Sequence, residues 1–277
     1  MPILHAIVLG LVQGLSEFLP ISSSGHLLLV PELFRWTELT DHPSLNKTFD
    51  VALHVGTFVG AAWYFRNDLA RYIAAGWRSL WRRSIRSVDE RMAWLLLLSA
   101  VPGAILGAAL ESVIEDHLGQ PVLIGVMFIV FAVVLYFADR LPTRRHQDEF
   151  RLRDALLMGG AQAVALQPGV SRSGITISMG RWLQFDRTAA TRLSFLMSLP
   201  IIAGAGLFKG AEVVRDGGIP DNYVAPFLWG MLAAAVSAFI VIALLLKFLQ
   251  THTFTPFVVY RIAAGAAVIL VFATGLR

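Results

Sequence analysis

The chain contains no cysteine, and only 15% of its 277 residues are charged. The lack of cysteine excludes disulfides, thiolate nucleophiles and cysteine-bound metals. The low charge, together with a hydrophobic share of 56%, excludes a soluble globular domain and is typical of a protein with several membrane spans. No basic leader precedes the first apolar run, so we expect no cleavable signal.

Most of the chain consists of apolar stretches that approach the roughly 20 residues needed for a membrane span. Six such spans are predicted, at about 50–65, 92–110, 120–138, 190–209, 224–248 and 256–275. Two further apolar segments, about 1–34 and 154–188, are interrupted by proline beside glycine and serine. We interpret each as a re-entrant pair of half-helices, because non-helical backbone at membrane depth must be buried in protein or line a wet cavity. Full spans are the alternative.

The charges of the loops predict an orientation. The net charge of +4 is interpreted as loop charge, since cytoplasmic loops are rich in Lys and Arg, and it predicts no nucleic-acid partner. The arginine-rich loops 66–91 and 139–153 are expected in the cytoplasm, and the loops near 111–116 and 210–223 outside, with both termini. The predicted fold is therefore an all-α polytopic membrane protein, one integral membrane domain over 1–277.

Two polar clusters look like one element used twice, 149 residues apart. The matched pairs are Gln13 with Gln162, Ser22 with Ser171, Ser24 with Ser173, and Gly25 with Gly174. Only the prolines, Pro20 and Pro168, slip by one position. With three spans in each half, the pattern predicts two inverted repeats, about 1–138 and 154–277. Their broken helices would meet near the middle of the membrane and form the functional site.

The first cluster carries an acidic group at membrane depth. Gln13 and Glu17 lie one helical turn apart on the same face, so both can point at one target. An ionised group there costs about 2.5–3.5 kcal/mol, which makes Glu17 a functional candidate by default. A structural, hydrogen-bonded glutamate is the alternative.

Serine, glycine and histidine follow the proline of the first cluster. Ser22, Ser23, Ser24 and Gly25 either cap a helix or offer its free N–H groups to a phosphate. His26, three residues beyond Ser23, is a candidate proton donor or base, although an isolated histidine is more often packed in a core.

The second cluster supplies a fixed positive charge. Arg172, between Ser171 and Ser173, presents a planar fork of donors suited to phosphate oxygens. A salt bridge to Glu17 is the simpler alternative, and substrate or metal could insert into it. Thr176, one turn after Ser173, either adds a hydroxyl to the site or packs between helices. Between the two clusters, Lys47, Asp50 and His54 are assigned to an interfacial belt in preference to the mouth of the site.

These motifs carry a specific resemblance. Gln13-x-x-x-Glu17 followed by FLPISSSGH, together with PGVSRSGIT ending at Thr176, resembles the undecaprenyl pyrophosphate phosphatase family of bacteria over essentially the whole chain. The resemblance implies removal of the terminal phosphate of undecaprenyl diphosphate, which regenerates the carrier lipid for cell-wall synthesis and confers bacitracin resistance. It also implies a bacterial cytoplasmic membrane, a site open to the periplasm, and a Mg²⁺ or Ca²⁺ ion. Many members carry Glu at the position of Gln13, so a metal site formed by Glu17 and Gln13 has one carboxylate here.

The expected mechanism follows from these residues and the resemblance. Arg172 and the N–H groups around Gly25 and Gly174 neutralise the lipid head group. Glu17 is a metal ligand or base, and Ser23 is the nucleophile assisted by His26, with attack by activated water as the alternative. A transporter built from the same repeats, or a scaffold without chemistry, is the rival function. The expected partners are the polyprenyl diphosphate and membrane lipid, with a homodimer possible.

Overall fold

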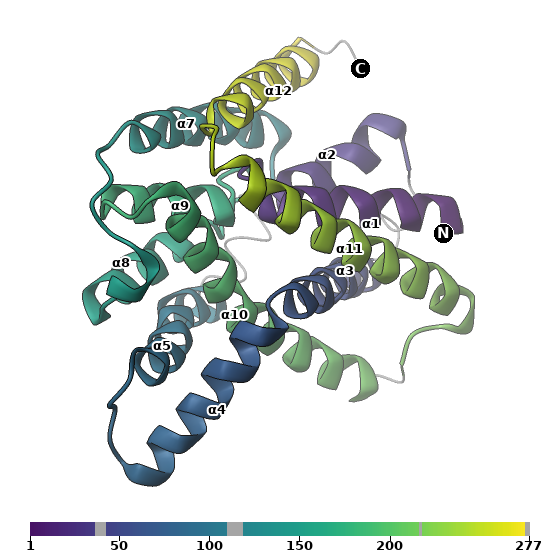
Figure 1. The fold of residues 1–277 in the computed structure, drawn as a ribbon. Helices are drawn as coiled ribbons and strands as arrows, with labels where there is room; N and C mark the ends of the chain where they lie inside the picture. The colour runs from purple at the N-terminus through teal and green to yellow at the C-terminus, as the bar shows by residue number, and fades with distance from the viewer. Residues whose placement is uncertain (37–42, 110–118, 216–217, 275–277) are drawn as a thin grey trace.

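The structure, a computed structural model, describes all residues except 37–42, 110–118, 216–217 and 275–277. The described residues form helices and, between Arg145 and Phe185, one isolated bridge (Figure 1). In the first half the helices are α1 (Ile3–Phe18), α2 (Ser23–Phe34), α3 (Pro43–Tyr64), α4 (Arg66–Arg82), α5 (Val88–Ala109) and α7 (Pro121–Asp139). The second half contains the 3-10 turn η1 (Gln147–Glu149), α8 (Leu152–Val164), α9 (Arg172–Trp182), α10 (Arg187–Arg215), α11 (Asp221–Phe248) and α12 (Thr255–Ala273).

Five of these helices are long and apolar enough to cross a membrane, namely α5, α7, α10, α11 and α12. They confirm five of the six predicted spans. The sixth, about 50–65, is the second half of α3, which is not among the five because polar side chains such as Lys47, Asp50 and His54 lower its apolar character. The predicted outer loop near 111–116 lies outside the described residues.

Both segments predicted to be broken helices are broken in the structure. Helices α1, α2, α8 and α9 have 16, 12, 13 and 11 residues, each less than a span requires. The breaks end in the same backbone conformation: Ser22 has φ 77° and Ser171 has φ 73°. A non-glycine residue at such a φ costs about 1–3 kcal/mol, and this strain occurs mainly at functional sites. The shared geometry supports the repeat, whereas the inversion stays a prediction.

Close helix crossings hold the two broken pairs in place. Helix α1 packs on α11, and α8 packs on α5. A Cβ on Gly10 would lie 2.3 Å from the carbonyl oxygen of Gly230, and one on Gly159 would lie 2.5 Å from that of Ser99. Since real Cβ atoms essentially never approach so closely, both crossings require glycine. Gly10 and Gly159 are also 149 residues apart, which again matches the predicted repeat.

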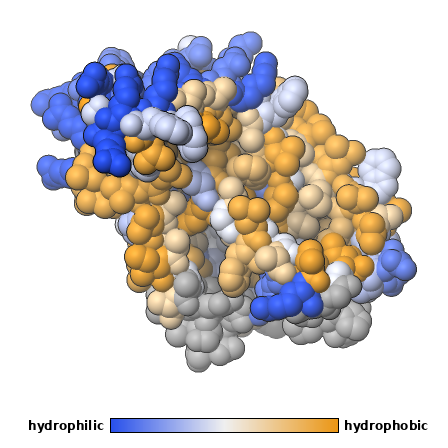
Figure 2. All heavy atoms as spheres, turned by 90° about the horizontal axis from the view of Figure 1, so that it is seen from below, coloured by the Kyte–Doolittle hydropathy of each residue, from blue (hydrophilic) through white to orange (hydrophobic). Residues whose placement is uncertain are grey.

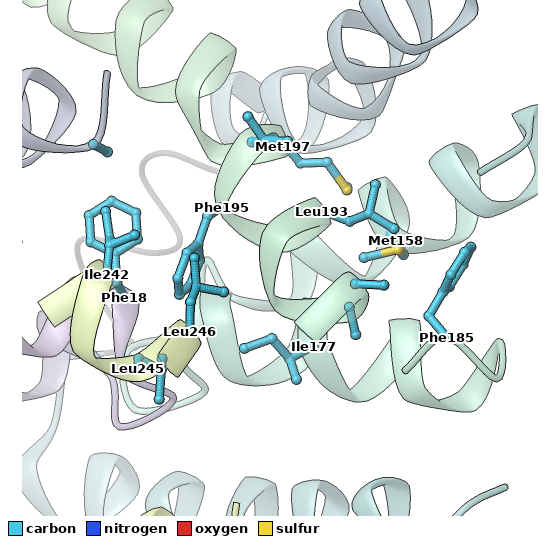
Figure 3. Close-up of a cluster of buried hydrophobic side chains, with 14 of the residues drawn as sticks. Phe18, Met158, Ile177, Phe185, Leu193, Phe195, Met197, Ile242, Leu245 and Leu246 are labelled. Atoms are coloured by element: carbon cyan, nitrogen blue, oxygen red, sulfur yellow. The ribbon is translucent and has the colours of Figure 1, made fainter. Parts of the chain in front are cut away.

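A buried hydrophobic cluster joins the helices that carry the polar segments to α10 and α11 (Figure 3). Phe18, the last residue of α1, is fully buried and meets Phe195 of α10 edge to face, with ring centroids 4.9 Å apart. Ile177 of α9 and Ile242 of α11 belong to the same cluster. Because Glu17 directly precedes Phe18, this packing fixes where its carboxylate lies.

Candidate active site

A cavity of about 300 Å³ opens where the two broken helix pairs meet. Its lining comes from both clusters, from α3 and from α10, and comprises Glu17, Ser22, Ser23, Ser24, Val51, His54, Ala165, Ser171, Arg172, Ile201, Ile202, Ala205 and Gly206. Direct hydrogen bonds join the clusters. The Gly169 N–H donates to Ser22 Oγ (3.2 Å), and Ser173 Oγ donates to the Leu19 carbonyl (2.9 Å). The structure thus brings together the two motifs that the sequence analysis paired.

Glu17 is the centre of the polar network. Arg172 Nη2 lies 2.9 Å from Glu17 Oε1. The other carboxylate oxygen, Oε2, accepts hydrogen bonds from Ser23 Oγ (2.5 Å) and Gln13 Nε2 (3.0 Å), and it lies 3.5 Å from His54 Nε2. With only 5% of its surface exposed, Glu17 depends on these partners, since an unpaired buried charge costs several kcal/mol.

Arg172 keeps one donor nitrogen for a ligand. Its Nη2 binds Glu17, whereas Nη1 is buried and has no hydrogen-bond partner among the residues that the structure describes. A buried donor without a partner is costly unless something else satisfies it. Since Arg172 lines the cavity, a phosphate oxygen there would satisfy Nη1 in the geometry that guanidinium groups favour.

The predicted phosphate-binding residues separate into two groups. Ser22, Ser24 and Ser171 line the cavity. The others lie behind it. A Cβ on Gly25 would lie 2.6 Å from the Phe128 ring, and one on Gly174 would lie 3.0 Å from Arg261, so both glycines permit close packing.

Ser173 and Thr176 also lie behind the cavity. Ser173 Oγ donates a hydrogen bond to the Leu19 carbonyl and lies 3.2 Å from Ser171 Oγ. Thr176 Oγ1 binds the Arg172 carbonyl (2.7 Å) and Ser194 Oγ (2.6 Å), and the residue is fully buried. For Thr176 the packing alternative is therefore the one that the geometry favours.

His26 lies away from the cavity lining. Its Nδ1 contacts the Ser22 carbonyl (2.6 Å), its Nε2 contacts Tyr260 Oη (2.6 Å), and its ring stacks on Phe128 and Tyr260. No contact joins it to Ser23 in the described part of the chain. The predicted assistance to Ser23 thus gains no geometric support, and the packed-histidine alternative fits better.

His54, which the sequence analysis assigned to an interfacial belt, is the histidine that lines the cavity. Its Nδ1 lies 2.8 Å from the Asp50 carbonyl oxygen, to which it must donate. That bond leaves Nε2 directed at Glu17, and 34% of the side chain is exposed. The only sequence signal was a histidine one turn after an aspartate. Recognising its role required knowing that α3 packs on α1.

Arg261 of α12 was missed by the sequence analysis. It is fully buried, and within the described residues its guanidinium donates to main-chain carbonyls, those of Pro20, Phe128, Met127, Gly169 and Val170. Three of these belong to the helix breaks, so Arg261 holds both breaks together from behind. An arginine inside an apolar span is a functional candidate by default, and this signal could have identified it.

The arrangement around Glu17 does not fit a cation held by protein side chains. One carboxylate oxygen already faces the Arg172 guanidinium, and the other accepts two hydrogen bonds. The described residues contain no group of three His, Cys, Asp or Glu side chains that could hold a metal ion. In the described part of the chain, Oε1 of Gln13 has no partner, but one amide oxygen beside a paired carboxylate is a poor site for Mg²⁺ or Ca²⁺. The ion stays a prediction.

Comparisons with known proteins agree with the motifs. The family model described as "Bacitracin resistance protein BacA" matches residues 6–267. A protein of Geobacter sulfurreducens named undecaprenyl-diphosphatase is 47% identical over 271 residues, which cover 97% of this chain and 98% of the relative. The undecaprenyl-diphosphatase of Pelobacter propionicus is 45% identical, and the match covers 100% of this chain and 99% of the relative. That of Geobacter metallireducens is 44% identical, and the match covers 96% of this chain and 97% of the relative. The chain therefore belongs to the BacA family of bacitracin resistance proteins.

Proposed function

We propose that this chain is an undecaprenyl-diphosphatase, which hydrolyses the terminal phosphate of undecaprenyl diphosphate and returns the monophosphate carrier lipid to cell-wall synthesis. The observation that carries the proposal is the cavity in which Glu17, Ser23 and Arg172 meet at membrane depth. The relatives' names supply the substrate. A lipid diphosphate needs a polar pocket for its head and apolar surroundings for its tail, and a cavity between broken helices offers both.

In the first step, Ser23 Oγ attacks the terminal phosphorus. The Ser23 proton passes to Glu17, which already accepts a hydrogen bond from this hydroxyl at 2.5 Å. The bond between the terminal phosphorus and the bridging oxygen breaks, and undecaprenyl phosphate leaves with that oxygen. Arg172 Nη1 binds the phosphate oxygens as their charge redistributes, because phosphoryl transfer depends mainly on positioning and charge stabilisation.

In the second step, water cleaves the phosphoserine and releases inorganic phosphate. Glu17 returns its proton to Ser23 Oγ as the phosphorus–oxygen bond breaks. His54 Nε2, on the open side of Glu17, is placed to accept a proton from the attacking water. Direct attack by water in a single step is the alternative, with Ser23 orienting the phosphate.

The location of the reaction is part of the proposal. The family resemblance implies a bacterial cytoplasmic membrane and a site that opens to the periplasmic face, and the arginine-rich loops predict which side of the chain is cytoplasmic. The relatives' family name supports a role in bacitracin resistance, because faster removal of undecaprenyl diphosphate would leave less of the lipid that the antibiotic binds. We also propose that a divalent cation enters with the diphosphate, and that the chain forms a homodimer.

Phosphate release tests the proposal. The purified chain in detergent is given undecaprenyl diphosphate, with and without Mg²⁺ or Ca²⁺, and inorganic phosphate is measured. We expect release by the wild type and a loss of at least about 100-fold in Glu17→Gln, which removes the proton acceptor. Ala263→Phe, an exposed position on α12, is the control for substitution in the membrane region. Absence of release by a folded wild-type protein under both conditions would reject the function.

A further inference from the structure

A second cavity, outside the active site, lies beside the α4–α5 hairpin. Its volume is about 400 Å³, and its walls are almost entirely apolar. Helices α3, α4, α5 and α10 contribute to it, with Phe58, Ile73, Trp77, Leu97 and Ala203 among the lining residues. Two of these helices, α5 and α10, are candidate membrane spans, so the groove lies at membrane depth.

Helix α10 separates this groove from the active-site cavity. Leu199 and Ala203 face the groove, whereas Ile201 and Ala205 face the active site. At 100° per residue these two pairs lie on nearly opposite sides of the helix. The groove and the active-site cavity therefore lie on different sides of α10.

Helix α4 is built as an interfacial helix. Its groove-facing side carries Ile73 and Trp77, which are 69% and 62% exposed. Arg78 and Arg82 lie on the other side and are also exposed. An amphipathic helix of this kind, with aromatic and aliphatic residues opposite arginine, lies at the boundary between lipid head groups and acyl chains.

The charge near the groove selects an anionic occupant. Segment 66–91 contains seven arginines and three acidic residues. The three acids already pair with other arginines, as in the contact between Arg82 and Glu90. Arg83 and Arg86 are exposed in the turn that follows Leu80, a groove residue. Figure 2 shows hydrophilic residues at opposite edges of the molecule, with a broad hydrophobic band between them.

From these observations we infer that the α4–α5 hairpin binds an anionic glycerophospholipid, with an acyl chain in the groove and the phosphate near Arg83 and Arg86. A dry apolar space of this size at membrane depth is filled by hydrocarbon, because water there would lack polar partners. Arginine near a membrane surface favours anionic over zwitterionic head groups. This site is independent of the proposed phosphatase reaction.

Lipid binding to the purified full-length chain tests the inference. Phosphatidylglycerol or phosphatidylcholine is titrated into the protein in detergent, and retained lipid is counted by native mass spectrometry together with the shift in Tm. We expect phosphatidylglycerol, and not phosphatidylcholine, to be retained and to raise Tm. In Arg83→Gln/Arg86→Gln the affinity should fall about 30-fold, at roughly 1 kcal/mol for each arginine. The matched control is Arg144→Gln/Arg153→Gln, which removes two exposed arginines elsewhere and should bind as the wild type.

A variant that fills the groove tests whether the acyl chain binds there, as opposed to the lipid being held by surface charge alone. Ala203→Phe should lower the retention of phosphatidylglycerol, whereas Ala263→Phe on the exposed side of α12 should not. Ala203→Leu serves if the larger side chain prevents folding, as judged by a cooperative melt without added lipid. The inference would be overturned if the two lipids had equal effects. It would also be overturned if the double arginine variant, or the folded groove variant, bound phosphatidylglycerol as the wild type does.

Discussion

Replacing Arg261 with methionine tests the link between the two helix breaks and the reaction. The change keeps an unbranched side chain of similar length but removes the donors to the carbonyls of Pro20, Gly169 and Val170. These carbonyls lie where the helices are interrupted, so no N–H group of a continuing helix replaces the lost donors. At about 1 kcal/mol for each hydrogen bond, the free energy of unfolding should fall by about 3 kcal/mol.

Activity should fall by more than the loss of folded protein explains. Without Arg261 the strained segments at Ser22 and Ser171 relax, and Glu17 and Arg172 move relative to each other. We expect a higher KM and a lower kcat when phosphate release is corrected for the folded fraction. Arg261→Lys keeps the charge and part of the hydrogen bonding, and should recover part of both.

The matched control for Arg261 is Arg181→Met. Arg181 is also fully buried and donates to the main-chain carbonyls of Asp139, Leu141 and Phe185, which lie outside the two helix breaks. Its loss should lower stability to a similar degree without changing KM. If folded Arg261→Met had the KM and kcat of the wild type, Arg261 would not position the active site. Equal changes in KM in the two methionine variants would lead to the same conclusion.

Three further predictions concern the site and the topology. Arg172→Lys should lower kcat about 100-fold in a folded protein, because an ammonium lacks the planar fork that can hold Glu17 on one nitrogen and phosphate on the other; near-normal kinetics would remove Arg172 from the site. His54→Gln should lower kcat more than His26→Gln does, because only His54 lines the cavity, and the opposite order measured by phosphate release would contradict the assignment. Single cysteines at Ser84 and Asn222 should be labelled from opposite faces of the membrane by an impermeant thiol reagent, and labelling from the same face would reject the inverted repeats.

The sequence predicted the fold class well because membrane solvation imposes strong patterns. Five apolar spans, two broken helix pairs and the meeting of the Ser/Gly clusters all follow from hydropathy, proline and an internal repeat. Glu17 and Arg172 were identified by charge at membrane depth, and their ion pair was one of the alternatives considered. Such residues are costly in a bilayer, and this makes them visible in a sequence.

The remaining site residues could not be assigned from local sequence. His26 ends the FLPISSSGH motif and was chosen for that reason, whereas His54 belongs to no motif. Only the packing of α3 on α1 places His54 next to Glu17. Arg261 acts on breaks more than 90 residues away in sequence, so no local pattern connects them. Tertiary contacts of this kind come from helix packing, which hydropathy and spacing do not specify.

Trapping the enzyme during one turnover tests the central claim, that Ser23 attacks the lipid diphosphate while Glu17 takes its proton. Undecaprenyl diphosphate labelled in its terminal phosphate is mixed with excess protein and quenched within a single turnover. We expect labelled phosphate on Ser23 of the wild type and none on Ser23→Ala, with little turnover by that variant. Ser22→Ala and Ser24→Ala should still be labelled at Ser23. Substantial turnover by Ser23→Ala, with no labelled wild-type protein, would contradict the account and assign the attack to water.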